Sequence, residues 1–354
     1  MTREIHYKKN LKIYWELVKE YKLLVFLTFA IIILMQAITL VTPFIFKQLV
    51  DKGGLFVNGT ITKVTFGKIL LVLLLAYGIS VLIYSICEWF RISILIKLDS
   101  NLKQSLKNRF FNHLIGLSHD FHASNKTGTL ISRMVRGGSS IESLTDTLTF
   151  QFLPLIFQYI LVSAALFIVD WRLPLIVTGL IITFLLINFY LLTIAAKIRL
   201  VRNEAEDKER ANIADTFTNI DSIKYFGKEL KIKKQFKGLT ENTRKSEVKS
   251  WAYHKVKDTL NFLVTSIFSL FIILIPIFGV INGTMSLGTL VFVWSAFRQL
   301  LGPLHGFTWG MRNFYRAMTD LEQLFRYEDV ENEIKDTPNA KILKIKQGRV
   351  EFKN

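Results

Sequence analysis

The sequence contains almost no cysteine, and long stretches of it contain no charged residue. Cys87 is its single cysteine, so neither a disulfide framework nor a cysteine-based metal cluster can form. Asp, Glu, Lys and Arg are all absent from 259–297, which is apolar almost throughout. That run is too long for one crossing, because about 20 apolar residues in a helix span a bilayer. It therefore predicts two membrane crossings that fold back at the turn signal Asn282-Gly283.

Four further runs are free or nearly free of charge: 23–46, 69–87, 147–169 and 173–196. None shows the alternation of a barrel strand, so the backbone must satisfy its hydrogen bonds in lipid as helices. The first run is too long, and too far from the start, for a signal peptide. The sequence thus predicts an all-α membrane protein with six transmembrane helices.

Basic residues are distributed unevenly between the two sides of these spans. Of the 45 Lys and Arg, 39 fall in 1–22, 91–143, 197–257 and 312–354. Because basic residues stay cytoplasmic, both termini and both long links are expected inside, in an inner (plasma) membrane crossed several times. The net charge of +17 then borders the anionic inner leaflet, so the lipid bilayer, and no nucleic acid, is the expected partner.

The two long inside links, 88–146 and 197–258, have apolar residues at helical spacing over most of their length. The turn-rich stretches HASNKTG and NIDSIKYFG interrupt them near their middles. Each link is therefore expected to be a long cytoplasmic helical extension: a helix that leaves the membrane, a short crosswise element and a helix that returns. Bracing of the spans would explain one such hairpin, but two of nearly equal length favour contact with something beyond the membrane.

Five stretches, in the right order on a six-span frame, resemble one known family. They are LSHDFHASNKTGTLISRM (117–134), DWRLPLIV (170–177), NIDSIKYFGKE (219–229), NGTMSLGTLVFVWSAFRQLLGPL (282–304) and the tail with DLEQLF and IKQGRVEFKN (345–354). The chain resembles the membrane domain of a type I ABC exporter of the half-transporter kind. Residues 1–330 would be the six-span domain, and 331–354 a linker and the first strand of an ATP-binding domain.

The resemblance implies a coupling helix in each link that docks on nucleotide-binding domains, and a homodimer or heterodimer with a second half-transporter. ATP closing those domains would switch the spans between inward-open and outward-open states. The first coupling helix maps to Ser118, His119, Asp120, Phe121, His122, Asn125 and Lys126. The second maps to Phe217, Asn219, Asp221, Ser222, Lys224, Tyr225, Phe226 and Gly227.

Two family features are missing from the sequence. It contains no G-x-x-x-x-G-K-[ST] phosphate loop, so no catalytic residue or cofactor is assigned to this chain. ATP and Mg²⁺ are expected to act through a nucleotide-binding domain outside it. The acidic residue usual after the Ser-Arg of the first link is also absent, because Arg133 is followed by Met134, Val135 and Arg136.

Polar residues within the spans are candidates for a substrate cavity, because such side chains usually face the bundle interior. They could equally bond helix to helix, since amides do so across spans. The set is Gln36, Gln151, Gln158, Asn188, Arg199, Asn261 and Arg298. A metal site at His119 and His122 is not expected, since spacing fixes no third strong ligand.

The resemblance leaves the substrate open between two classes. One subfamily exports glutathione-linked or metal-linked compounds and uses an Arg pair on the fourth span and an Asn–Gln set on the fifth. Only Arg199 and Asn261 fit, with Ala195 and Val264 in the other positions. Lipids or hydrophobic drugs are therefore the preferred expectation, and glutathione or metal conjugates the alternative. A scaffold that has lost its motor is the remaining possibility.

Overall fold

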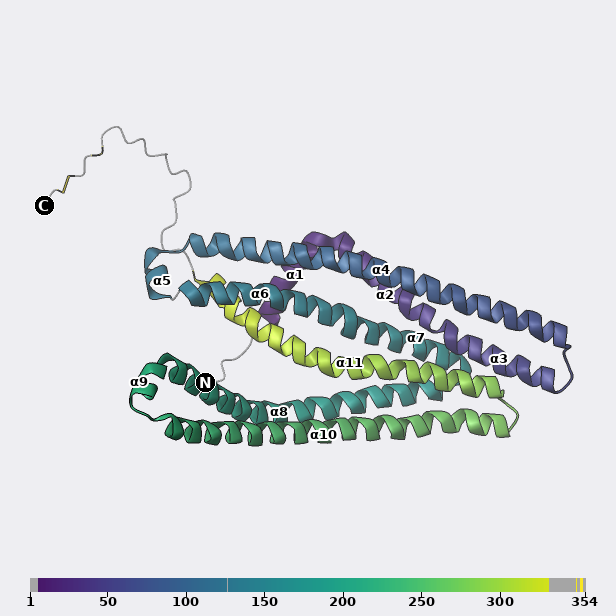
Figure 1. The fold of residues 1–354 in the computed structure, drawn as a ribbon. Helices are drawn as coiled ribbons and strands as arrows, with labels where there is room; N and C mark the ends of the chain where they lie inside the picture. The colour runs from purple at the N-terminus through teal and green to yellow at the C-terminus, as the bar shows by residue number, and fades with distance from the viewer. Residues whose placement is uncertain (1–5, 126, 331–347, 349–350, 353–354) are drawn as a thin grey trace. The chain divides into compact units, whose positions relative to one another are not determined.

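The structure is a computed structural model, and it describes residues 6–125, 127–330, 348 and 351–352. Its α-helices are α1 (Tyr7–Val18), α2 (Lys22–Thr39), α3 (Val41–Val57), α4 (Lys63–Ile115), α5 (His119–Ser124), α6 (Thr127–Thr147), α7 (Leu153–Val169), α8 (Arg172–Thr218), α9 (Ile220–Tyr225), α10 (Glu229–Ile281) and α11 (Leu287–Phe325). Short 3₁₀ turns join α1 to α2 (Lys19–Tyr21) and follow α11 (Arg326–Asp329), and a π-helical turn (Leu148–Phe152) joins α6 to α7. Figure 1 shows these helices along the chain.

Six helical stretches in the described part of the chain are long and apolar enough to cross a membrane. The all-α membrane fold that the sequence predicts is therefore confirmed. The last two crossings separate where expected, because α10 ends at Ile281 and α11 begins at Leu287. Gly283 has φ +70° there, and Thr284 N–H donates to Gly279 O at 2.8 Å, which closes the end of α10 as a left-handed C-terminal cap.

The two long links are helical extensions of the spans, as expected. The helix α4 has 53 residues, which at 1.5 Å each is roughly 80 Å, far more than the roughly 30 Å hydrocarbon core. It continues through the short α5 into α6, and α8 continues through α9 into α10 (Figure 1). The predicted linker and strand in 331–354 lie almost wholly outside the described residues.

Packing divides the chain into two compact units, each with its own apolar core. The first unit comprises Met1–Phe29, Arg91–Phe150 and Gly310–Asn354. Its core joins α1, the distal part of α4, α6 and the end of α11, where Phe110 and Phe325 stack at 5.6 Å. Both rings are only 1% exposed, so this part of the molecule holds together as a packed helical bundle.

The second unit comprises Ala30–Phe90 and Gln151–Trp309. Its core joins α7, α8, α10 and the first half of α11. Along α11 the residues Val293, Ala296, Phe297, Leu300 and Leu304 are at most 1% exposed and follow helical spacing. This stripe buries one side of α11, and many apolar residues of the spans remain exposed, as contact with lipid requires.

Candidate functional site

The tip of the first helical hairpin is α5, which lies within the predicted segment 118–126. Ser118 precedes its first turn with extended backbone, and Asp120 lies in that turn, where a carboxylate favours the helix N-terminus. The Phe121 ring meets the Tyr327 ring edge-on at 5.8 Å. His122 Nε2 lies 3.0 Å from the carbonyl oxygen of Leu114. The first tip is thus fastened to its own packed unit.

The remaining predicted residues of this tip play smaller local roles. His119 is exposed beside Asp120. Asn125 Nδ2 donates to the Phe121 carbonyl at 2.9 Å and closes the end of α5. Lys126 lies outside the described residues.

The second tip is α9, which lies within the predicted segment 217–227. Asn219 Nδ2 donates to the Asp215 carbonyl at 2.9 Å, where α8 ends. Gly227 has φ +59°, a conformation that favours glycine, and it lets the chain turn into α10. Lys224 Nζ pairs with Glu229 at 3.2 Å across that turn.

Aromatic side chains at the second tip are left open to solvent. Tyr225 is 88% exposed, Phe226 75% and Phe217 71%. Asp221 and Ser222 are exposed beside them. Large aromatic groups exposed together are typical of a protein–protein contact surface. Both short helices, α5 and α9, thus lie within the segments that the resemblance assigns to coupling helices.

Within the second unit, Gln158 belongs to a polar network that ties α2, α7 and α11. Its Nε2 donates to Gln299 Oε1 at 3.2 Å, and its Oε1 accepts from Thr39 Oγ1 at 3.2 Å. Gln299 Nε2 in turn donates to the Thr39 carbonyl at 2.8 Å. That carbonyl has no intrahelical donor four residues on, because Pro43 has no N–H. The hydrogen bond from Gln299 satisfies the Thr39 carbonyl instead, as a backbone group within lipid requires.

Asn188 of α8 and Asn261 of α10 form the second polar tie. Each amide nitrogen donates to the other residue's Oδ1, at 2.9 and 3.3 Å. Asn261 is 3% exposed. The Tyr253 hydroxyl donates to the Leu191 carbonyl nearer the inner end of the same helices. In this structure the two amides bond helix to helix.

The other candidates for a substrate cavity have different surroundings. Gln36 is buried at 8% exposure and its carbonyl accepts from Thr39 Oγ1 at 2.7 Å. Gln151 is half-buried in the π-helical turn. Arg298 lies with its guanidinium 5.8 Å from the Trp294 ring centre, and Arg199 is exposed on α8. Gln158, Asn188 and Asn261 thus bond helix to helix, and a substrate cavity formed by the seven residues stays a prediction.

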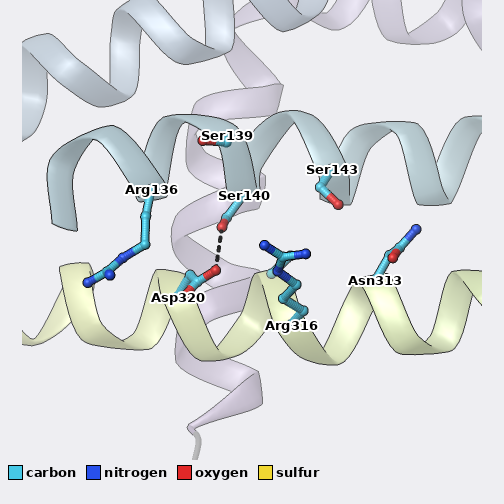
Figure 2. A pocket seen from close by; sticks show the side chains of 8 residues that line it. Arg136, Ser139, Ser140, Ser143, Asn313, Arg316 and Asp320 are labelled. Carbon is cyan, nitrogen blue, oxygen red and sulfur yellow. Dashed lines mark hydrogen bonds between the residues drawn. The ribbon is translucent and has the colours of Figure 1, made fainter. Parts of the chain in front are cut away.

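Sequence reasoning did not single out Thr39, Gln299 or Tyr253. The sequence does indicate Thr39, because Pro43, four residues later, has no N–H to donate to the Thr39 carbonyl. A groove between α6 and α11 was also missed, because its residues are ordinary charged and hydroxyl side chains with no motif. Figure 2 shows it, with Arg136 and Ser140 on one helix and Arg316 and Asp320 on the other.

Six helical spans with two helical hairpins, each tipped by a short crosswise helix, define the membrane domain of a transporter. Residues 25–304 match the family described as ABC transporter transmembrane region, and the chain belongs to that family. The type I exporter resemblance is confirmed.

Two relatives illustrate the match. The human mitochondrial iron–sulfur clusters transporter ABCB7 is 27% identical over 318 residues, which are 88% of this chain and 42% of that protein. The iron–sulfur clusters transporter ATM1 of Yarrowia lipolytica is 23% identical, over 98% of this chain and 49% of that protein. The chain thus spans about half the length of the curated relatives it matches.

A solved structure shows the same fold. A bacterial Atm1-family ABC exporter with ATP bound superposes with a TM-score of 0.69 at 22% identity. The match covers 92% of this chain and 56% of that one. At this identity the likeness supports the arrangement of helices alone.

Proposed function

We propose that this chain forms the translocation path of an ATP-driven exporter, as one half of a homodimer or heterodimer. Nucleotide-binding domains would dock on α5 and α9, and ATP with Mg²⁺ would be bound there. The observation that carries this proposal is the exposed aromatic group Phe217, Tyr225 and Phe226 at the end of a long rigid hairpin. Closure of the docked domains would move α8 and α10, whose roots are tied within the membrane by the Asn188–Asn261 pair.

The proposed location is an inner membrane, with both termini on the basic side. The distribution of Lys and Arg supports this orientation. Cysteines placed at 122 and 222 should be labelled by a membrane-impermeant maleimide only after the membrane is opened. Labelling of either position in intact cells would overturn the orientation.

The substrate class has two candidates, each favoured by one observation. Relatives named iron–sulfur clusters transporters support a metal-linked or glutathione-linked compound. Ala195 and Val264, where that subfamily has basic and amide side chains, support a lipid or hydrophobic drug instead. We favour the conjugate class, because the relatives match over nearly the whole chain whereas the departures concern two positions.

The test is ATP-driven uptake by inside-out vesicles that contain the chain together with its nucleotide-binding domains. Glutathione disulfide and a glutathione–metal complex would be compared with a fluorescent phospholipid and a hydrophobic dye. Saturable uptake of the first pair alone supports the conjugate class, and uptake of the second pair alone replaces it. No ATP-driven uptake of any of them, despite ATP hydrolysis, would argue for a different substrate class or for a role other than transport.

A further inference from the structure

A polar groove of about 260 Å³ lies between α6 and α11 in the first unit. Arg136, Ser140 and Ser143 line it from α6, and Asn313, Arg316 and Asp320 line it from α11 (Figure 2). Both helices belong to one packed core, in which Ile141 and Leu144 lie with Met318 and Leu321. The two walls are therefore held in place by the apolar residues beside the groove.

The charges on these walls do not balance. Ser140, at 5% exposure, donates to Asp320 Oδ2 at 3.2 Å, which engages the groove's carboxylate. Arg136 and Arg316 form no ion pair or hydrogen bond within the residues the structure describes. By contrast, Arg109 in the same unit contacts both Glu16 and Glu328. Two guanidinium groups against one carboxylate leave the groove with a surplus positive charge.

The groove lies where the inner membrane surface is expected. Ser143 precedes the apolar run that begins at Thr147 by four residues, or about 6 Å of helix. On α11, Arg312 is the first charged residue after Arg298; Asn313 follows it directly and Arg316 one helical turn later. These positions correspond to the phosphate level of the inner leaflet or to the water just below it. Basic pockets between helices at this level are suited to lipid head groups.

We propose that this groove is a binding site for a phosphate group, presented either by an anionic phospholipid of the inner leaflet or by a soluble phosphate ester. Guanidinium groups bind phosphate through paired N–H donors, and Arg136 and Arg316 supply them from opposite walls. Ser143 and Asn313 add neutral donors. Asp320 reduces the net charge to one, which suits a singly charged phosphodiester better than a doubly charged phosphate.

Basic residues also collect at the inner end of membrane helices without binding anything, so the experiment must separate a site from a solvated surface. The purified chain in neutral detergent would be titrated with short-chain phosphatidylglycerol, short-chain phosphatidylcholine and glycerol 3-phosphate. Native mass spectrometry would count bound ligands. The measurement involves neither ATP hydrolysis nor transport, so its outcome is independent of the proposed function.

Arg136→Gln and Arg316→Gln should each weaken phosphatidylglycerol binding by about tenfold, since a charge-assisted hydrogen bond is lost. Asp320→Asn should strengthen it, because the opposing carboxylate disappears while the Ser140 hydrogen bond can remain. Arg210→Gln, on an exposed face of α8, is the matched control and should bind as the wild type does.

The ligands distinguish the two sources of phosphate. Arginine-dependent binding of phosphatidylglycerol without glycerol 3-phosphate identifies a lipid site, and the same dependence for glycerol 3-phosphate identifies a soluble ester. Equal binding by wild type and both arginine variants for every ligand overturns the proposal. An arginine variant that melts at a lower temperature without ligand is left out of the comparison, and the test then rests on Asp320→Asn. Phosphatidylglycerol binding by Asp320→Asn that is weaker than or equal to that of the wild type rejects the site.

Discussion

The tips of the two helical hairpins have the same design and are held in different ways. At the first tip, the Phe121 ring packs on Tyr327, which belongs to a core with α1 and the end of α11. At the second tip, α9 has no buried residue, and Tyr225 and Phe226 face solvent. The α8–α10 hairpin is tied at its root, through Asn188 and Asn261, rather than at its end. One tip is thus stabilised by its own chain, and the other is exposed to solvent, where we propose that a partner binds.

Replacement of Tyr225 and Phe226 by Ala should produce the largest effect on function. Truncation of aromatic anchors at an interface typically costs about 2 kcal/mol or more, which is more than tenfold in an equilibrium. ATP-driven uptake should therefore fall at least about tenfold while the melting temperature stays unchanged. Uptake and melting would be measured on the same preparation with its nucleotide-binding domains.

The matched control is Trp251→Ala, which removes another exposed aromatic of the same hairpin away from its tip. It should leave uptake unchanged. Phe121→Ala sharpens the comparison, because it should lower the melting temperature as well as uptake. Equal melting losses for the two tips would contradict the difference in how they are held.

A glycine pair tests the same contrast through stability alone. A Cβ added at Gly137 of α6 would lie 2.3 Å from Leu324 Cδ2, inside a core where Leu324 is 0% exposed. Gly137→Ala should therefore destabilise the first unit by about 1–3 kcal/mol, the usual cost of overpacking. A Cβ added at Gly238 of α10 would meet no atom within 4 Å outside the nearby backbone of its own helix. Gly238→Ala should therefore stabilise the helix by about 0.5–1 kcal/mol.

Thermal unfolding followed by tryptophan fluorescence measures both variants. A melting loss at Gly238 as large as that at Gly137 would mean that the second hairpin is packed as tightly as the first. A gain at both positions would remove the structural basis of the comparison.

The spans, their number and the two hairpins followed from charge-free runs and helical spacing, because lipid imposes those patterns on any sequence that crosses it. The tips were placed by resemblance, and α5 and α9 lie inside the predicted segments. The pairing of Asn188 with Asn261 could not be predicted from the sequence. An amide in a span has no preferred partner until packing brings one within reach, 73 residues away here.

The groove at Arg136 and Arg316 shows the same limit for charged residues. Both are ordinary helical arginines in the sequence, and only the packing of α6 on α11 brings them to one cavity. The Thr39 carbonyl, which has no donor within its own helix, is a different case. Pro43 makes it predictable from spacing, whereas Gln299, its donor, is known only from the structure.

The Asn188–Asn261 tie leads to a smaller expected effect. Double-mutant cycles of interhelical hydrogen bonds in membranes give about 0.6 kcal/mol and at most about 1.7. Asn188→Ala and Asn261→Ala should therefore show a coupling in this range, so the double variant is less destabilised than the sum. Additive melting losses together with a large loss of uptake would instead assign these amides to the substrate.

Asp99 of α4 gives a comparably small expected effect and tests the packed first unit by pH. It lies in the helical extension of α4, twelve residues past the apolar run that ends at Cys87, and is 8% exposed. Burial, together with the nearby carboxylates Asp146 and Glu142, raises the pKa of Asp99 from 3.8 to about 7, and Lys103 opposes the shift only in part. Between pH 3.8 and about 7 the Asp99 carboxyl is ionised in the unfolded chain but still protonated in the folded one. The free energy of unfolding therefore falls as the pH rises through this range and rises again on acidification.

Asp99→Asn removes that charge and should raise the melting temperature at pH 8 by about 2–4 °C, as about 1 kcal/mol does in a chain of this size class. The gain should be smaller at pH 5, where part of the wild-type Asp99 penalty has already gone. Asp207→Asn, on the exposed face of α8, is the control for the substitution itself. A gain from Asp99→Asn that is equal at both pH values would mean that the substitution acts through packing, because a charge buried in the first unit must respond to the proton.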